Sequence, residues 1–168
     1  MKKLVSLGAA LGVVITVLSA TAANAQQPPS PEQVQAWATT LPRPPTSLLD
    51  PVYSPIDAIH QLDSTYAVMI QDFNQNRPGD AWTTAGEGSK AVDHYRRLLV
   101  HSPDNNLNHL TNRALNQVGD VFDDVDGTKT QQAAKKAPRS ALLWAGVETT
   151  LKQYGIDTGE PWSLSNAR

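Results

Sequence analysis

The chain contains no cysteine. Disulfides, thiol nucleophiles, cysteine-ligated zinc, iron–sulfur clusters and thiolate-ligated haem are therefore excluded. The absence of cysteine after the apolar N-terminal run also excludes the thioether lipid of a bacterial lipoprotein. Because small exported domains often depend on disulfides, a domain of this kind has to be stabilised by burial of apolar side chains.

An excess of positive charge is also missing, since 14 Lys and Arg stand against 16 Asp and Glu. Proteins that bind nucleic acid need a basic face to displace counterions, and the same holds for attachment to anionic lipid. The composition therefore predicts no nucleic-acid partner and no electrostatic membrane binding.

The sequence has no segment that alternates apolar and polar residues long enough for a confident β-strand. It also has no internal repeat at a fixed spacing. Apolar residues instead recur with the period of a helix. We therefore predict an all-α protein: a compact bundle of four main helices plus a short leading helix, with a proline-rich N-terminal strap.

The N-terminus is typical of a secretory signal peptide over residues 1–25. Two lysines precede an uncharged apolar run, and Ala23-Asn24-Ala25 matches the small-x-small rule for cleavage before Gln26. The alternative is an uncleaved anchor, because residues 4–23 are about long enough to cross a bilayer. The sequence predicts an exported protein, located in the periplasm, in the cell envelope or outside the cell.

Residues 26–55 contain many prolines, which exclude a long helix or a central strand. A short helix still fits, with Ser30 as N-cap, Pro31 as first residue and an apolar stripe from Val34 to Leu41. The prolines after Leu41 predict an extended strap over the domain. They stand at positions 28, 29, 31, 42, 44, 45, 51 and 55.

Residues 56–168 are predicted as a helical domain with a polar C-terminal tail. Ser54-Pro55 and Ser102-Pro103 are expected to begin two helices, and Thr128 to cap a third. A loop is expected from Asn74 through Trp82 and Gly88. The predicted helices are about 55–73, 89–101, 103–125 and 129–154, the last kinked or restarted at Pro138.

The last of these helices is expected to end at Tyr154-Gly155, with glycine in the left-handed conformation. Its buried face is predicted to consist of Leu142, Leu143, Val147, Leu151 and Tyr154.

Residues 119–127, GDVFDDVDG, resemble a calcium loop at first sight. If Gly127 takes the sixth position of an EF-hand loop, Phe122 takes the first and Ala133 the twelfth, and neither side chain carries an oxygen. The stretch is better interpreted as a helix end with its carboxylates on the solvent side. A weak surface cation site at Asp123, Asp124 and Asp126 is the alternative.

Signatures of hydrolases are missing from the sequence. Glu87 is the single weak catalytic candidate: it lies between two glycines in a predicted loop near Trp82, a place where the general acid of a wall-degrading hydrolase could stand. The four histidines lack the spacing of a zinc site. A haem or metal carrier would have to use a residue such as Tyr66 or His60. We predict no cofactor.

The remaining candidates are binding residues. Asn105, Asn112 and Asn116 share one side of a helix and could bind a sugar or a peptide backbone. Trp82 and Trp162 fall in stretches that resemble loops, where a ring is available for contact. The sequence therefore predicts a non-catalytic binding protein with an envelope or extracellular protein or glycan as partner. The runner-up is an accessory subunit of a membrane complex, held by an uncleaved leader.

Overall fold

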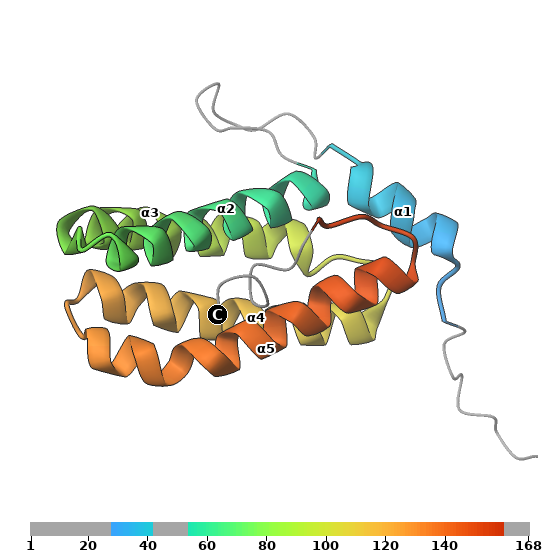
Figure 1. Cartoon of the computed structure of the whole chain (residues 1–168). Coiled ribbons are helices and arrows are strands. Elements are labelled where there is room, and N and C mark those ends of the chain that lie inside the picture. The colour runs from blue at the N-terminus through green and yellow to red at the C-terminus, as the bar shows by residue number, and fades with distance from the viewer. Residues whose placement is uncertain (1–27, 42–53, 160–168) are drawn as a thin grey trace, which may run out of the picture.

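The computed structural model describes residues 28–41 and 54–159, and every regular element in these ranges is a helix. Figure 1 shows two layers of long antiparallel helices with a short helix at one end. The predicted all-α bundle of four main helices plus a leading helix is confirmed. The elements are α1 (Pro31–Thr39), α2 (Pro55–Asn74), α3 (Pro78–Leu99), α4 (Asn105–Asp126) and α5 (Thr130–Gln153).

The predicted starts of α1 and α2 are confirmed. Ser30 and Ser54 are the N-caps, each forms a capping box with the residue three positions later, and proline follows each cap. In each box the serine hydroxyl accepts a hydrogen bond from the backbone N–H of the residue three positions later. The side chain of that residue accepts one from the backbone N–H of the serine, so two N–H groups that would otherwise lack partners are satisfied.

The predicted start of α4 at Ser102-Pro103 is wrong by two residues. Asp104 is the N-cap, and its Oδ1 accepts from the backbone N–H of Asn106 at 2.8 Å and of Leu107 at 3.3 Å. Ser102 instead supports this cap, since its Oγ accepts from the backbone N–H of Asp104 at 3.1 Å.

The predicted loop through Trp82 and Gly88 is also wrong, because α3 begins at Pro78 and runs through both glycines. A Cβ on Gly88 would lie only 2.7 Å from Cζ of Phe122. Glycine in a helix costs up to about 1 kcal/mol relative to alanine, but here it lets α3 approach α4 over the Phe122 ring. Packing between helices therefore overrides a local pattern that is typical of a loop.

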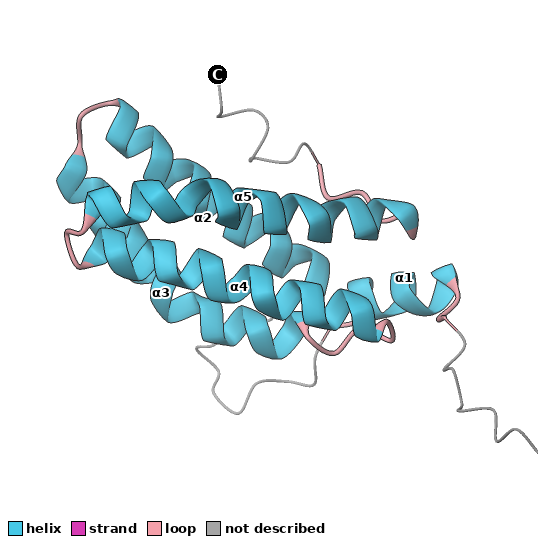
Figure 2. Ribbon diagram, turned by 90° about the horizontal axis from the view of Figure 1, so that it is seen from below, coloured by secondary structure: helices cyan, strands magenta, loops and turns pink. Residues whose placement is uncertain are grey.

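The helices form an up-and-down arrangement in which α2 packs on α3, α3 on α4 and α4 on α5. Figures 1 and 2 both place α1 at one end of this bundle, where Val34 and Ala38 are buried in the common core. The core is mainly aliphatic. Its largest fully buried apolar side chains are Trp144, Tyr66, Phe122, Ile59, Leu62, Met69, Leu99, Leu107, Leu115 and Leu151.

α5 is one helix that contains Pro138, so the proline neither ends nor restarts it. The prediction that Thr128 caps this helix is wrong. Lys129 is the N-cap and makes no side-chain capping bond, while Thr128 adopts a positive φ of 60°.

The predicted buried face of α5 needs a correction. Leu142 is 74% exposed, whereas Val147 and Leu151 are buried as predicted. The buried face is rotated about the helix axis relative to the predicted one. It includes Ser140, Trp144 and Glu148, which the prediction from the leucine spacing left out.

The predicted glycine ending of α5 is confirmed, with Gly155 at φ +75°. The N–H of Gly155 donates to the carbonyl of Lys152, and the N–H of Ile156 donates to that of Leu151. This is the Schellman pattern, and the buried Ile156 packs back on the last turn.

The predicted leader (1–25), most of the predicted strap (42–53) and Trp162 lie outside the described residues. Across 28–41 and 54–159, no helix is long and apolar enough to cross a membrane.

Candidate functional site

An apolar cavity of about 210 Å³ lies between α2, α4 and α5. None of its lining residues is charged, and nine of the ten are apolar or aromatic. α2 contributes Tyr66, Met69, Ile70 and Phe73, α4 contributes Val121 and Val125, and α5 contributes Thr130, Ala133, Ala134 and Ala137. We call this space the α2/α4/α5 cavity.

The cavity exists because the first half of α5 carries alanines where a closed bundle would carry leucines. Ala133 and Ala137 are four residues apart, so they present the same face one turn from each other. They leave space opposite the larger side chains of Met69 and Phe73. Consistent with this, α2 and α5 approach each other less closely than the other neighbouring helices of the bundle do.

Tyr66 lies in the wall of the cavity and is only 1% exposed. Its ring packs against Phe122, with centroids 5.7 Å apart. Burial raises the pKa of Tyr66 to about 12, so the phenol stays neutral and keeps its proton. The hydroxyl can therefore both donate and accept a hydrogen bond.

A row of buried polar groups continues along the interface of α2 and α5 beyond Tyr66. Trp144 Nε1 donates to Asp63 Oδ1 at 2.5 Å. Glu148, one turn further along α5, is fully buried. Burial, together with the charge of Asp63 and its hydrogen bond with Glu148, raises the pKa of Glu148 to about 8. Glu148 is therefore a neutral acid at neutral pH and can donate to Asp63.

Two close carboxyl groups, one of which has a raised pKa, are also a feature of acid–base catalysts. Here, however, the Glu148 carboxyl has no exposed surface and does not line the α2/α4/α5 cavity. A general acid must reach the substrate within hydrogen-bonding distance. The pair is thus an internal element of the bundle.

The GDVFDDVDG stretch forms the end of α4, with Gly127 as C-cap, as predicted. The prediction that all its carboxylates face solvent is wrong for Asp124, which is 7% exposed and pairs with Lys136 Nζ at 2.6 Å. The hydrogen bond to Asp124 raises the pKa of Lys136. A cation does offset the acids at this helix end, and it is a lysine of α5.

The three candidate cation ligands meet different neighbours. Asp123 accepts from the hydroxyl of Ser89 on α3, Asp124 contacts Lys136, and Asp126 lies against Gly86. In the part of the chain that the structure describes, no three His, Asp or Glu side chains gather as metal ligands do.

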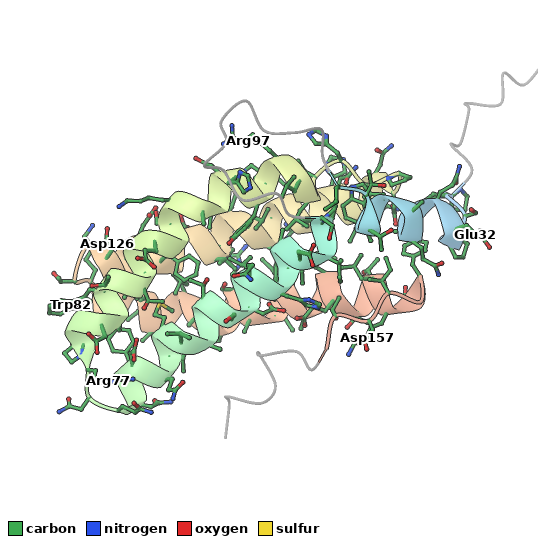
Figure 3. The ribbon with its side chains drawn as sticks, turned by 90° about the horizontal axis from the view of Figure 1, so that it is seen from above. Glu32, Arg77, Trp82, Arg97, Asp126 and Asp157 are labelled. Atoms are coloured by element: carbon green, nitrogen blue, oxygen red, sulfur yellow. The ribbon has the colours of Figure 1, made fainter. Side chains whose placement is uncertain are left out.

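Glu87 lies in the middle of α3 and is exposed to solvent, not in a glycine-rich loop. Trp82 lies on the same helix and is 37% exposed, at the end of the bundle that also carries Asp126 (Figure 3). The premise that made Glu87 a catalytic candidate, a glycine-rich loop beside Trp82, is therefore wrong.

The candidate asparagines do not form one site. Arg96 Nη1 donates to Oδ1 of Asn112 at 2.7 Å and to Oδ1 of Asn116 at 2.6 Å, which bridges α3 and α4. Asn105 lies instead in a groove of about 460 Å³ near Pro103 and Tyr154.

The haem alternative finds no support in the α2/α4/α5 cavity, although Tyr66 lines it. About 210 Å³ is less than the roughly 300–1,000 Å³ of pockets that hold drug-sized ligands. His60, His101 and His109 are exposed.

The sequence interpretation missed the residues that form this region, above all Ser140, Glu148 and Asp63. One signal was available: Trp144, Val147, Glu148 and Leu151 follow the helical spacing i, i+3, i+4 and i+7, which puts a glutamate on an apolar face. The run of alanines at 133, 134 and 137 gave no comparable signal, since alanine occurs on either side of a helix.

Comparison of this chain with protein-family models, with curated proteins and with solved structures finds no match.

Proposed function

We propose that the protein is an exported, non-catalytic binding protein that holds a small, neutral, mainly apolar molecule in the α2/α4/α5 cavity. The observation that carries this proposal is the cavity itself: about 210 Å³, without a charged lining residue, between three helices of a small bundle and open to solvent beside Thr130 and Ala134. Export is supported by the leader-like N-terminus of the sequence.

The volume limits the ligand. An enclosed apolar cavity of roughly 150 Å³ accepts a benzene molecule. A space of about 210 Å³ therefore suits a ligand of roughly eight to ten non-hydrogen atoms, such as a substituted benzene ring or a short alkyl chain. Burial of eight carbon atoms yields about 6 kcal/mol before the cost of immobilisation, so we expect Kd values between about 10 µM and 1 mM.

An empty apolar cavity costs stability, since the side chains around it lose contacts. The sequence could remove this cost by placing a leucine at 133 or 137, and helix propensity would not oppose the change. The presence of alanine at both positions is consistent with a role for the space.

The test is a titration of the isotope-labelled protein with ethylbenzene, followed by amide chemical shifts. We expect saturable shifts in the residues around the cavity, and we expect Ala137→Leu to abolish them by filling the space. Ala133→Leu is a second filling variant, and Ala36→Leu, on the exposed side of α1, is the matched control that should bind like wild type. Absence of saturable shifts in the wild-type protein would refute the proposal, as would equal binding by both filling variants.

A further inference from the structure

We propose that Asp63, Trp144 and Glu148 form a proton-controlled clasp, which holds α2 against α5 beside the cavity and opens when Glu148 loses its proton. The ligand is then bound more tightly while Glu148 is protonated and more weakly at higher pH. This inference rests on the proposed function and specifies how its site is regulated.

The two layers of the bundle are joined unequally. α2 packs closely on α3, α5 packs closely on α4, and the α3/α4 interface connects the layers along one side (Figure 1). On the other side, which we call the α2/α5 seam, the two helices approach each other less closely. The α3/α4 interface can therefore act as a hinge, and the α2/α5 seam is the side where the layers can separate.

One end of the α2/α5 seam has additional support. There α1 packs on α2, and Gln35 Nε2 donates to the carbonyl of Tyr154, at the end of α5, at 2.7 Å. The cavity lies at the opposite end of the seam, between residues 66–73 of α2 and 130–137 of α5. Because α1 holds the other end, separation of α2 from α5 is expected to be largest at the cavity.

The clasp crosses the seam between these two ends. Trp144 Nε1 of α5 donates to Asp63 Oδ1 of α2, and Glu148 interacts with Asp63 from the next turn of α5. Trp144 and Glu148 are both fully buried. While Glu148 keeps its proton, its carboxyl can donate to the Asp63 carboxylate, so both side chains of α5 hold that helix against α2.

Ionisation of Glu148 turns this attraction into repulsion. Two carboxylates then lie close to each other at the seam, and the one on Glu148 is buried away from water. Lys152, one turn further along α5, offsets part of the new charge. Of the titratable residues on the surrounding elements, Tyr95 and Asp104 are buried without positive charge, and His60, His109 and Arg113 are exposed. Movement of α5 away from α2 would separate the carboxylates and admit water.

A ligand in the cavity contacts the same two helices as the clasp. The lining includes Met69 and Ile70 of α2 and Ala133 and Ala137 of α5. Two interactions that both require α2 and α5 to be close favour each other, and this coupling is reciprocal. Opening of the clasp therefore weakens ligand binding, and a bound ligand makes Glu148 harder to deprotonate.

Spin labels can measure the seam directly, because two introduced cysteines would be the only thiols of the chain. Gln71→Cys on α2 with Arg139→Cys on α5 reports the seam near the cavity. Gln71→Cys with Lys90→Cys on α3 is the matched pair within one layer, and all three residues are exposed. We expect the α2/α5 distance to increase from about pH 6 to about pH 9, and the α2/α3 distance to stay constant. In the Glu148→Gln background both distances should stay constant.

Titrations with ethylbenzene at the same two pH values test the coupling. We expect the Kd of wild type to rise at least about fivefold at the higher pH, and that of Glu148→Gln to change less than about twofold. Asp63→Asn is a second variant, which can still accept from Trp144 but lacks the repelling charge. Its seam should open less than that of wild type. Circular dichroism establishes that each variant is folded before its distances are compared.

The outcomes separate the two proposals. A constant α2/α5 distance in wild type would overturn the clasp, as would equal opening in Glu148→Gln. Separation of both label pairs together would also overturn it, because that result marks unfolding of the whole bundle. If the seam opens but ethylbenzene binds equally at both pH values, the regulation is refuted and the binding site stands. If the seam opens and ethylbenzene binds at neither pH, the clasp stands and the proposed function fails.

Discussion

Glu148→Gln tests the buried carboxyl pair most directly. The pKa of Glu148 is raised from 4.5 to about 8, with burial as the first cause and Asp63 as the second. One pKa unit corresponds to about 1.4 kcal/mol, so the protonation of this one group accounts for about 5 kcal/mol of pH-dependent stability.

The sign follows from proton binding. Below pH 4.5 both the folded and the unfolded chain hold the proton, and its contribution to stability is fully present. Between pH 4.5 and about 8 the unfolded chain loses the proton while the folded chain keeps it. The free energy of unfolding therefore falls as pH rises, by about 1.4 kcal/mol per pH unit from this group, and levels off above about pH 8.

The assay is urea unfolding of wild type and Glu148→Gln from about pH 5 to about pH 9. Glutamine cannot ionise, so the stability of wild type relative to the variant should fall by about 4 kcal/mol over this range. Glu87→Gln, at an exposed glutamate of α3, is the matched control and should follow wild type. In Asp63→Asn the fall should end at a lower pH, since one of the two causes is removed. Parallel curves for wild type and Glu148→Gln would refute the reasoning.

Three further predictions concern packing and backbone. Gly88→Ala should destabilise the protein by about 1–3 kcal/mol, because the new Cβ would overlap the Phe122 ring, whereas Gly79→Ala meets no neighbour and should be neutral or slightly stabilising in the same thermal unfolding assay. Gly155→Ala should cost about 1–2 kcal/mol in chemical denaturation, since its φ of +75° is strained for alanine, and an unchanged midpoint would contradict the left-handed ending. Ser140→Ala should raise the free energy of unfolding by about 1 kcal/mol by removing an unsatisfied hydroxyl; a loss of stability instead would show that the hydroxyl has a partner.

Helix identity and most helix ends could be predicted from the sequence because their causes are local. Ser30 and Ser54 act as caps through bonds within one turn, and Gly155 ends α5 through its own φ. The stretch around Gly88 could not be predicted in the same way. Its helical state depends on the Phe122 ring of another helix, which compensates for the low helix propensity of glycine.

The candidate site was less accessible to sequence analysis. The acidic cluster around Asp123 and the glycine-flanked Glu87 were candidate sites because of their local sequence. In the structure the cluster makes ordinary hydrogen bonds and ion pairs, and Glu87 is exposed to solvent. The α2/α4/α5 cavity depends on the spacing between two helices, and side chains as plain as Ala133 and Ala137 line it. The one sequence signal for this region is Glu148, an acidic residue on an otherwise apolar helix face.

Pro138 gives the two halves of α5 unequal anchoring. Its ring nitrogen carries no hydrogen, so the helical bond to the carbonyl of Ala134 is missing at the point where the cavity wall ends. Before the proline, only Ala133 is fully buried, whereas several large side chains hold the helix after it. The segment from 130 to 137 is therefore held less firmly than the remainder of α5, and it is the same segment whose exposed Thr130 and Ala134 border the solvent-facing side of the cavity.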